Sequence, residues 1–133
     1  RPKSSAASDV YKRQGNAIRV PTPNVSLAVL VLNLKEDVTK EGLNEFLKTS
    51  AFTSKYRQII GYTNSPEAVS TDFYSSPFAT IIDSQATIAE GSQVTVYCWY
   101  DNEFGYSKQV LNLTKKIAKI ELPRFPLAID TSV

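Results

Sequence analysis

The sequence predicts an α+β fold, and three observations carry this prediction. An unbroken apolar run of strand length lies near the start, an amphipathic helical pattern follows it, and an alternating strand pattern near the end leads directly into a second helical pattern. The order strand, helix, strands, helix fits a sheet packed with helices. With 133 residues, the chain is long enough for one domain and short for two.

The first strand and the first helix are the clearest elements of the N-terminal half. Residues 25–34 read VSLAVLVLNL, which predicts a central strand buried on both faces. Thr39 is placed to cap the helix that follows, because its hydroxyl can accept from a first-turn N–H group. The apolar face of this helix is predicted from the spacing of Leu43, Phe46, Leu47 and Ser50.

The middle of the chain reads as loops and short strands. Turn-forming residues make 61–68 a predicted loop, and a short strand is predicted over 69–73. Further strand pieces are predicted over 78–83 and 86–88.

Residues 93–100 alternate between two faces, which predicts a buried strand, and a helix is predicted over 104–119. Asp101 and Asn102 lie between them and suit an N-cap. Ligand-binding groups often gather at such strand ends in α/β proteins. Taken alone, the same residues also make an ordinary polar turn. The helix stripe consists of Tyr106, Val110, Leu113 and Ile117.

Composition removes several kinds of catalytic site. The chain has no histidine and one cysteine, which excludes a Ser-His or Cys-His pair, a His-based metal site and an internal disulfide. Cys98 lies in the apolar strand and is predicted to be an inert core residue. Asp72 and Asp83 are candidates for paired carboxylates, the alternative being that they cap turns or pair with basic side chains. No apolar run is long enough for a bilayer, and no signal peptide is recognisable.

The positive charge belongs to the first residues of the chain. Residues 1–14 hold four basic residues and one acid, and removing them leaves 11 basic and 12 acidic residues, a net charge of −1. The charge therefore gives no reason to expect nucleic acid as a partner. We expect residues 1–14 to be disordered and a non-native leader, with a native basic arm as the alternative.

Two segments resemble the glyceraldehyde-3-phosphate dehydrogenase family. Residues 99–107, WYDNEFGYS, resemble the stretch before its C-terminal helix, and residues 15–24, GNAIRVPTPN, resemble its arginine-valine-proline-threonine segment. The resemblance implies that residues 15–133 are the C-terminal part of the catalytic domain. It further implies an incomplete domain with a mainly antiparallel sheet, helices packed on one face and a C-terminal helix.

The resemblance also implies roles for three residues. Arg19 matches the arginine that binds phosphate, and its guanidinium fork suits phosphate oxygens. Asn102 matches the asparagine that holds the nicotinamide carboxamide, since an Asn amide both donates and accepts. Tyr106 matches the tyrosine that packs against the nicotinamide ring.

The implied function is that of an oxidoreductase of glycolysis and gluconeogenesis, which oxidises glyceraldehyde 3-phosphate with NAD or NADP and inorganic phosphate. The chain lacks the Gly-x-Gly-x-x-Gly turn of the binding domain and the family's catalytic cysteine and histidine, so we expect no catalytic residue within it and no activity from it alone. The resemblance implies a cytoplasmic homotetramer for the full-length protein, with no membrane partner. The alternatives are a non-catalytic α+β interaction module, an erythrose-4-phosphate dehydrogenase relative, or a nucleic-acid-binding domain.

Overall fold

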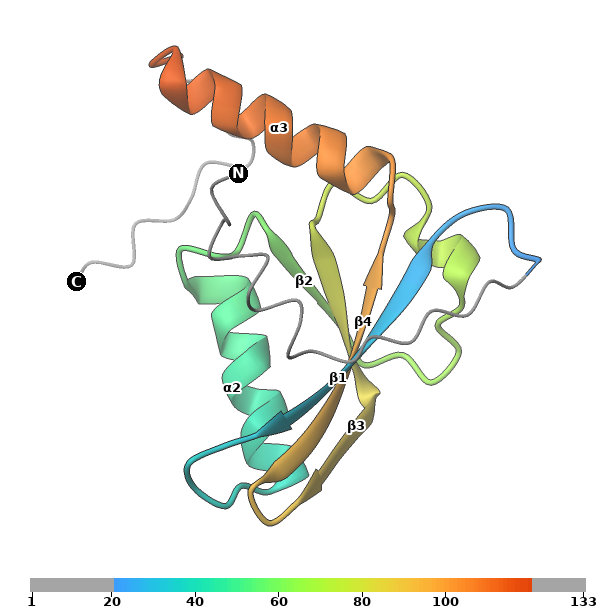
Figure 1. Ribbon diagram of the computed structural model, residues 1–133, viewed down its shortest axis with the longest axis vertical. Helices are drawn as coiled ribbons and strands as arrows, with labels where there is room; N and C mark the ends of the chain where they lie inside the picture. The colour runs from blue at the N-terminus through green and yellow to red at the C-terminus, as the bar shows by residue number, and fades with distance from the viewer. Residues whose placement is uncertain (1–20, 121–133) are drawn as a thin grey trace, which may run out of the picture.

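A computed structural model gives the structure of the chain and describes residues 21–120. Residues 1–14 and Arg19 lie outside the described residues. Four strands form one sheet, a long helix lies against it, and a second long helix extends from its end (Figure 1). The predicted α+β class is therefore confirmed. The elements are β1 (Ser26–Asn33), α2 (Lys40–Thr53), β2 (Ile60–Thr63), the 3₁₀ turn η1 (Ser70–Phe73), β3 (Thr80–Glu90), β4 (Gln93–Tyr100) and α3 (Phe104–Ile117).

The sheet has the order β1-β4-β3-β2 and is mainly antiparallel. Strand β4 pairs antiparallel with both β1 and β3, whereas β2 pairs parallel with β3. The register between β3 and β4 shifts between Asp83 and Ile88, which marks an irregularity in a long strand. This order brings the start of β1 and the end of β4 together, because Ser26 lies opposite Tyr100.

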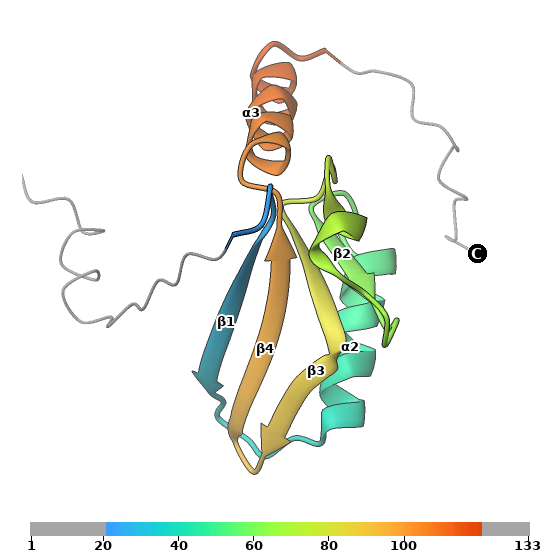
Figure 2. The same cartoon turned by 90° about the vertical axis from the view of Figure 1, so that its right-hand side faces the viewer.

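Helix α2 covers one face of the sheet beside β2 and β3 (Figure 2). Thr39 caps it as predicted, since its Oγ1 accepts from the Gly42 N–H at 3.1 Å. Leu43 and Leu47 pack against the buried side chains of the sheet, but Phe46 is 68% exposed. The prediction that Phe46 belongs to the buried stripe is therefore wrong. The core beneath α2 consists of Ile82, Val96 and Cys98, with Ala28, Leu43, Leu47, Ile60 and Tyr62 packed around them.

Strand β1 forms where the apolar run predicted a strand, but the expected burial on both faces is wrong. It lies at the edge of the sheet with β4 as its only neighbour among the described strands. Helix α2 covers β2 and β3 and leaves β1 open. As a result, each large apolar side chain of β1 is at least 41% exposed, namely Leu27, Val29, Leu30, Val31 and Leu32.

Three predictions for the middle of the chain need correction. Ile60–Thr63 is a strand rather than the start of a loop, and Ser70–Phe73 is a 3₁₀ turn rather than a strand. The two strand pieces predicted after residue 77 belong to one strand, Thr80–Glu90. The 3₁₀ turn is favoured because Asp72 Oδ2 accepts from the Val69 N–H at 2.9 Å, which closes the chain on itself.

Helix α3 continues from β4 and projects past the end of the sheet (Figure 2). Its first turns rest on the loop before β3. A Cβ atom on Gly105 would lie 2.7 Å from the carbonyl oxygen of Phe78, so only glycine permits this close approach. Gln109 Nε2 donates to the Pro77 carbonyl oxygen at 3.0 Å. None of the described helices has the length and apolar content needed to span a membrane.

Candidate functional site

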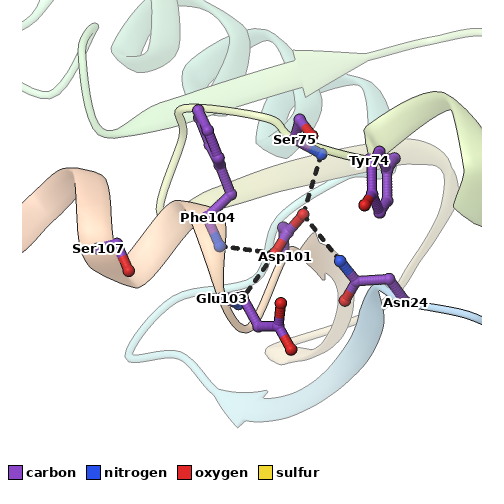
Figure 3. A pocket seen from close by; sticks show the side chains of 7 residues that line it. All are labelled: Asn24, Tyr74, Ser75, Asp101, Glu103, Phe104 and Ser107. Atoms are coloured by element: carbon purple, nitrogen blue, oxygen red, sulfur yellow. Dashed lines mark hydrogen bonds between the residues drawn. The ribbon is translucent and has the colours of Figure 1, made fainter.

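The turn between β4 and α3 is organised around a buried carboxylate. Asp101 is only 3% exposed. Its Oδ1 accepts from the backbone N–H groups of Glu103 at 2.9 Å and Phe104 at 2.8 Å, which caps the start of α3 (Figure 3). Its Oδ2 accepts from the Ser75 N–H at 2.9 Å and from Asn24 Nδ2 at 3.2 Å. One side chain thus joins three segments that are far apart in the sequence.

These contacts decide the charge state of Asp101. Burial by itself raises the pKa of a carboxyl, because it disfavours the charged form. Here the N–H groups of Phe104, Ser75 and Glu103 and the amide of Asn24 outweigh burial, and the pKa of Asp101 lies below its ordinary value. The turn therefore contains a carboxylate that is ionised and fully hydrogen-bonded.

Both segments that reach Asp101 from outside α3 carry unusual backbone. Ser75 has φ of 59° and Val25, next to Asn24, has φ of 71°. A β-branched residue such as Val25 rarely adopts a positive φ. Asn24 Oδ1 accepts from the Val25 N–H at 2.7 Å, and Val25 is buried with Phe73 and Ile81. The surrounding contacts therefore hold a backbone conformation that the sequence alone disfavours.

A hollow of about 260 Å³ opens beside this carboxylate (Figure 3). Tyr74 and Phe104 lie on either side of it, and the acidic groups of Asp101 and Glu103 contribute to its wall. Because Asp101 already accepts four hydrogen bonds, its oxygens serve the fold rather than a ligand. The lining residues are Asn24, Tyr74, Ser75, Asp101, Glu103, Phe104 and Ser107.

The residues expected to contact the cofactor lie next to this hollow but do not line it. Asn102 is exposed at the strand end, and its Nδ2 donates to Ser26 Oγ at 2.8 Å. Tyr106 lies in the first turn of α3 and is 72% exposed. Arg19 lies outside the described residues. The described structure therefore presents Asn102 and Tyr106 to solvent at one end of the sheet.

Other candidate residues have structural roles. Asp72 caps the 3₁₀ turn, and Asp83 accepts from Trp99 Nε1 at 3.1 Å and from the Gln85 N–H at 3.1 Å. Both carboxylates therefore stabilise turns or side chains of the fold, as the structural alternative for them predicted. Cys98 is buried, and burial raises the pKa of its thiol, so it is a core residue as predicted. Within residues 21–120, no group of three acidic or cysteine side chains is arranged to hold a metal ion.

Three polar residues of this region were not singled out from the sequence: Asn24, Ser26 and Ser75. Asn24 ends the segment over residues 15–24 that carries the family resemblance, but no role was assigned to it, and the two serines are common loop and strand residues. Their contacts with Asp101 and Asn102 span 26 to 77 positions in the chain. The available signal was the strand order, because pairing β1 with β4 brings residues 24–26 to residues 100–102.

Comparisons with known proteins connect this fold to one family. The family model described as "Glyceraldehyde 3-phosphate dehydrogenase, C-terminal domain" matches residues 7–102. A glyceraldehyde-3-phosphate dehydrogenase-like protein of Pseudomonas aeruginosa (strain UCBPP-PA14) is 49% identical over 115 residues, which cover 86% of this chain and 25% of that relative.

Two further relatives are called glyceraldehyde-3-phosphate dehydrogenases. Glyceraldehyde-3-phosphate dehydrogenase 2 of Bacillus subtilis (strain 168) is 46% identical over 108 residues, 80% of this chain and 31% of the relative. The protein of Zymomonas mobilis subsp. mobilis (strain ATCC 31821 / ZM4 / CP4) is 41% identical over 109 residues, 81% of this chain and 32% of the relative. The matched part of this chain thus spans about a quarter to a third of the length of these relatives.

Proposed function

This chain belongs to the glyceraldehyde-3-phosphate dehydrogenase family, through its C-terminal domain, and from that premise we propose that it is part of an oxidoreductase. The proposed reaction is the oxidation of glyceraldehyde 3-phosphate with NAD or NADP and inorganic phosphate. We place the full-length protein in the cytoplasm, in glycolysis or gluconeogenesis, as a homotetramer. The domain division proposed is a leader over residues 1–14 and the catalytic-domain segment over residues 15–133. The family match begins at residue 7, so the boundary at residue 14 rests on composition alone.

The observation that carries this proposal is the turn after β4. Asn102 is held on an exposed edge by the buried anchor next to it, Asp101, and its amide offers both a donor and an acceptor. Such an amide is complementary to a carboxamide, so the residues present fit the nicotinamide group of the cofactor. Tyr106 lies in the following helical turn with its ring exposed, which suits packing against a flat ring. When bound, the cofactor would supply the hydride acceptor.

The remaining chemistry needs residues outside this chain. The chain has no histidine, and its one cysteine is buried in the sheet, so it offers neither a thiolate nucleophile nor an imidazole base. Arg19 would bind a phosphate through its guanidinium group. The chain therefore supplies one phosphate ligand and part of the nicotinamide pocket, and we expect no dehydrogenase activity from it alone.

A full-length hybrid tests the proposal. In it, residues 15–120 of this chain replace the matched part of the Bacillus subtilis relative, and phosphate-dependent NAD reduction is measured with glyceraldehyde 3-phosphate. Arg19→Ala should lower kcat/KM for the phosphate-bearing substrates by about 10- to 100-fold, the effect of losing a charge-assisted hydrogen bond. Asn102→Ala should raise the KM for NAD by about tenfold.

Matched controls separate these effects from general damage. Arg57→Ala and Asn64→Ala remove an exposed arginine and an exposed asparagine elsewhere, and both hybrids should keep the parent kinetics. An active hybrid that is indifferent to Arg19→Ala and Asn102→Ala would overturn the site assignment. A folded hybrid without activity would favour the non-catalytic interaction module instead. If the large graft does not fold, a smaller graft of residues 19–27 and 98–107 carries the same substitutions.

A further inference from the structure

Asn102 has a partner from the other end of the described chain. Ser26 is the first residue of β1 and lies opposite Tyr100 of β4. Its Oγ accepts from Asn102 Nδ2 at 2.8 Å, which is an ordinary, well-formed hydrogen bond. The bond joins the strand end to the turn, although the two residues are 76 positions apart.

This hydrogen bond limits what the Asn102 amide can do. One N–H of Nδ2 is directed at Ser26, so the amide plane is fixed and Oδ1 is left as the acceptor. Asn102 is exposed, and no other side-chain hydrogen bond to it is present among the described residues. Without Ser26, its side chain would sample several rotamers, and a ligand would have to select one of them at an entropic cost.

The backbone beneath Asn102 is held separately. Asp101 fixes the turn through the N–H groups of Glu103 and Phe104 on one side and of Ser75 on the other. The Ser26 hydroxyl is therefore not needed to hold the backbone of the turn, and it acts only on the Asn102 side chain. The pairing of Ser26 with Tyr100 uses main-chain groups, so removing the hydroxyl leaves the sheet intact.

We propose that Ser26 is a positioning residue that orients the Asn102 amide for a carboxamide-bearing ligand, the nicotinamide group of the cofactor. The inference rests on the proposed function of Asn102 and extends it to a residue on another strand. Ser26 does not itself touch the ligand. It leaves Asn102 Oδ1 as an acceptor for the carboxamide NH₂ group.

The test uses the full-length hybrid described above. Ser26→Ala should raise the KM and the Kd for NAD by about three- to tenfold, the range for one net hydrogen bond. The KM for glyceraldehyde 3-phosphate should stay unchanged, because Ser26 acts only on the cofactor side. Ser26→Thr keeps the hydroxyl and suits a strand, so it should restore the parent values. Ser92→Ala, a half-buried serine at the far end of the sheet, is the matched control.

A double substitution distinguishes positioning from a general structural effect. If Ser26 acts through Asn102, adding Ser26→Ala to Asn102→Ala should cause no further loss of NAD affinity. An additive loss, or failure of Ser26→Thr to restore affinity, would overturn the inference. If Asn102→Ala impairs NAD binding and Ser26→Ala does not, this inference alone fails. If Asn102→Ala leaves NAD binding unchanged, the proposed function of Asn102 is wrong, and the role of Ser26 that rests on it is wrong as well. Should the large graft not fold, the smaller graft, which contains both residues, gives the same readings.

Discussion

Asp101 supports the turn on which the candidate site depends, and its charge makes this support sensitive to acid. Because the folded-state pKa lies below the unfolded value of about 3.9, the carboxylate stabilises the fold fully at neutral pH. That stabilisation is lost as the pH falls through the folded-state pKa. Asp101→Asn should therefore cost about 2 kcal/mol in the free energy of unfolding at pH 7, and less near pH 3.

Urea unfolding of the full chain between pH 3 and pH 7 measures this difference. Asp37→Asn is the control, because Asp37 is exposed and should change the unfolding free energy little at either pH. A constant gap between the Asp101→Asn variant and the parent chain across this range would show that charge is not the cause.

A substitution at Gly105 tests the close packing of α3 against the loop before β3. A methyl group at this position would meet the Phe78 carbonyl oxygen at 2.7 Å, and backbone gives way less easily than a side chain. Gly105→Ala should therefore lower the free energy of unfolding by about 1–3 kcal/mol, although alanine is the better helix former. Thermal unfolding followed by circular dichroism checks this, and an equal or higher Tm would contradict the close approach.

The site was predictable from the sequence only in its local part. The capping role of Asp101 follows from its place between a strand and a helix, and the structure confirms it. Its other partners, Asn24 and Ser75, come from loops, and Ser26 reaches Asn102 only after β1 and β4 pair. Such contacts depend on tertiary structure, which propensity and spacing do not report. The functional roles of Arg19, Asn102 and Tyr106 stay predictions.

At the scale of elements, α3 is anchored at one end only within residues 21–120. The attachments described for it lie at Gly105 and Gln109, whereas Leu113 and Ile117 are 59% and 75% exposed. Helices gain most of their stability from packing, so the last two turns should open readily. In the full chain, amides of residues 111–117 should exchange hydrogen faster than those of Val94–Cys98, as measured by mass spectrometry. Equal protection would show that α3 is held along its whole length.

Segments with a strong periodic pattern were predicted well, whereas segments whose structure depends on contacts with other parts of the chain were not. The alternating pattern of β4 and the helical pattern of α3 lie close to where they were predicted. Strand β2 was not predicted because its residues are typical of a turn. Gly61 instead packs against the Phe78 ring, and a Cβ atom at this position would lie 2.9 Å from Phe78 Cδ2. The segment Ser70–Phe73 contains one β-branched residue, Thr71, and one aromatic residue, Phe73. It nevertheless forms a 3₁₀ turn, in which the Asp72 carboxylate accepts from the Val69 N–H group. Local propensity is overridden in both places.

At the scale of the molecule, α2 covers one face of the sheet, and within residues 21–120 the other face is covered only at one end, where Phe73 packs against Val25, Ile81 and Trp99. The open part of this second face carries Leu27, Val29 and Val31 of β1, which lie opposite Trp99, Tyr97 and Thr95 of β4. A partly exposed apolar strand at a sheet edge favours association with other chains. Val31 is 61% exposed, so Val31→Lys should reduce self-association of the chain without loss of stability.

Light scattering and circular dichroism together measure this outcome. Val96→Lys is the contrasting variant, because Val96 is only 6% exposed and a charge there should unfold the sheet. Unchanged scattering from a folded Val31→Lys chain would show that the open face does not drive association.

The pairing of β1 with β4 also has a consequence during synthesis. Residues 26–33 leave the ribosome well before residues 93–100 exist, and translation adds about 5–20 residues per second. For several seconds the nascent chain therefore presents one of its most apolar segments without a partner. Among the described strands, the one that is made first is thus among the last to be paired, which makes it a natural target for chaperones acting on growing chains.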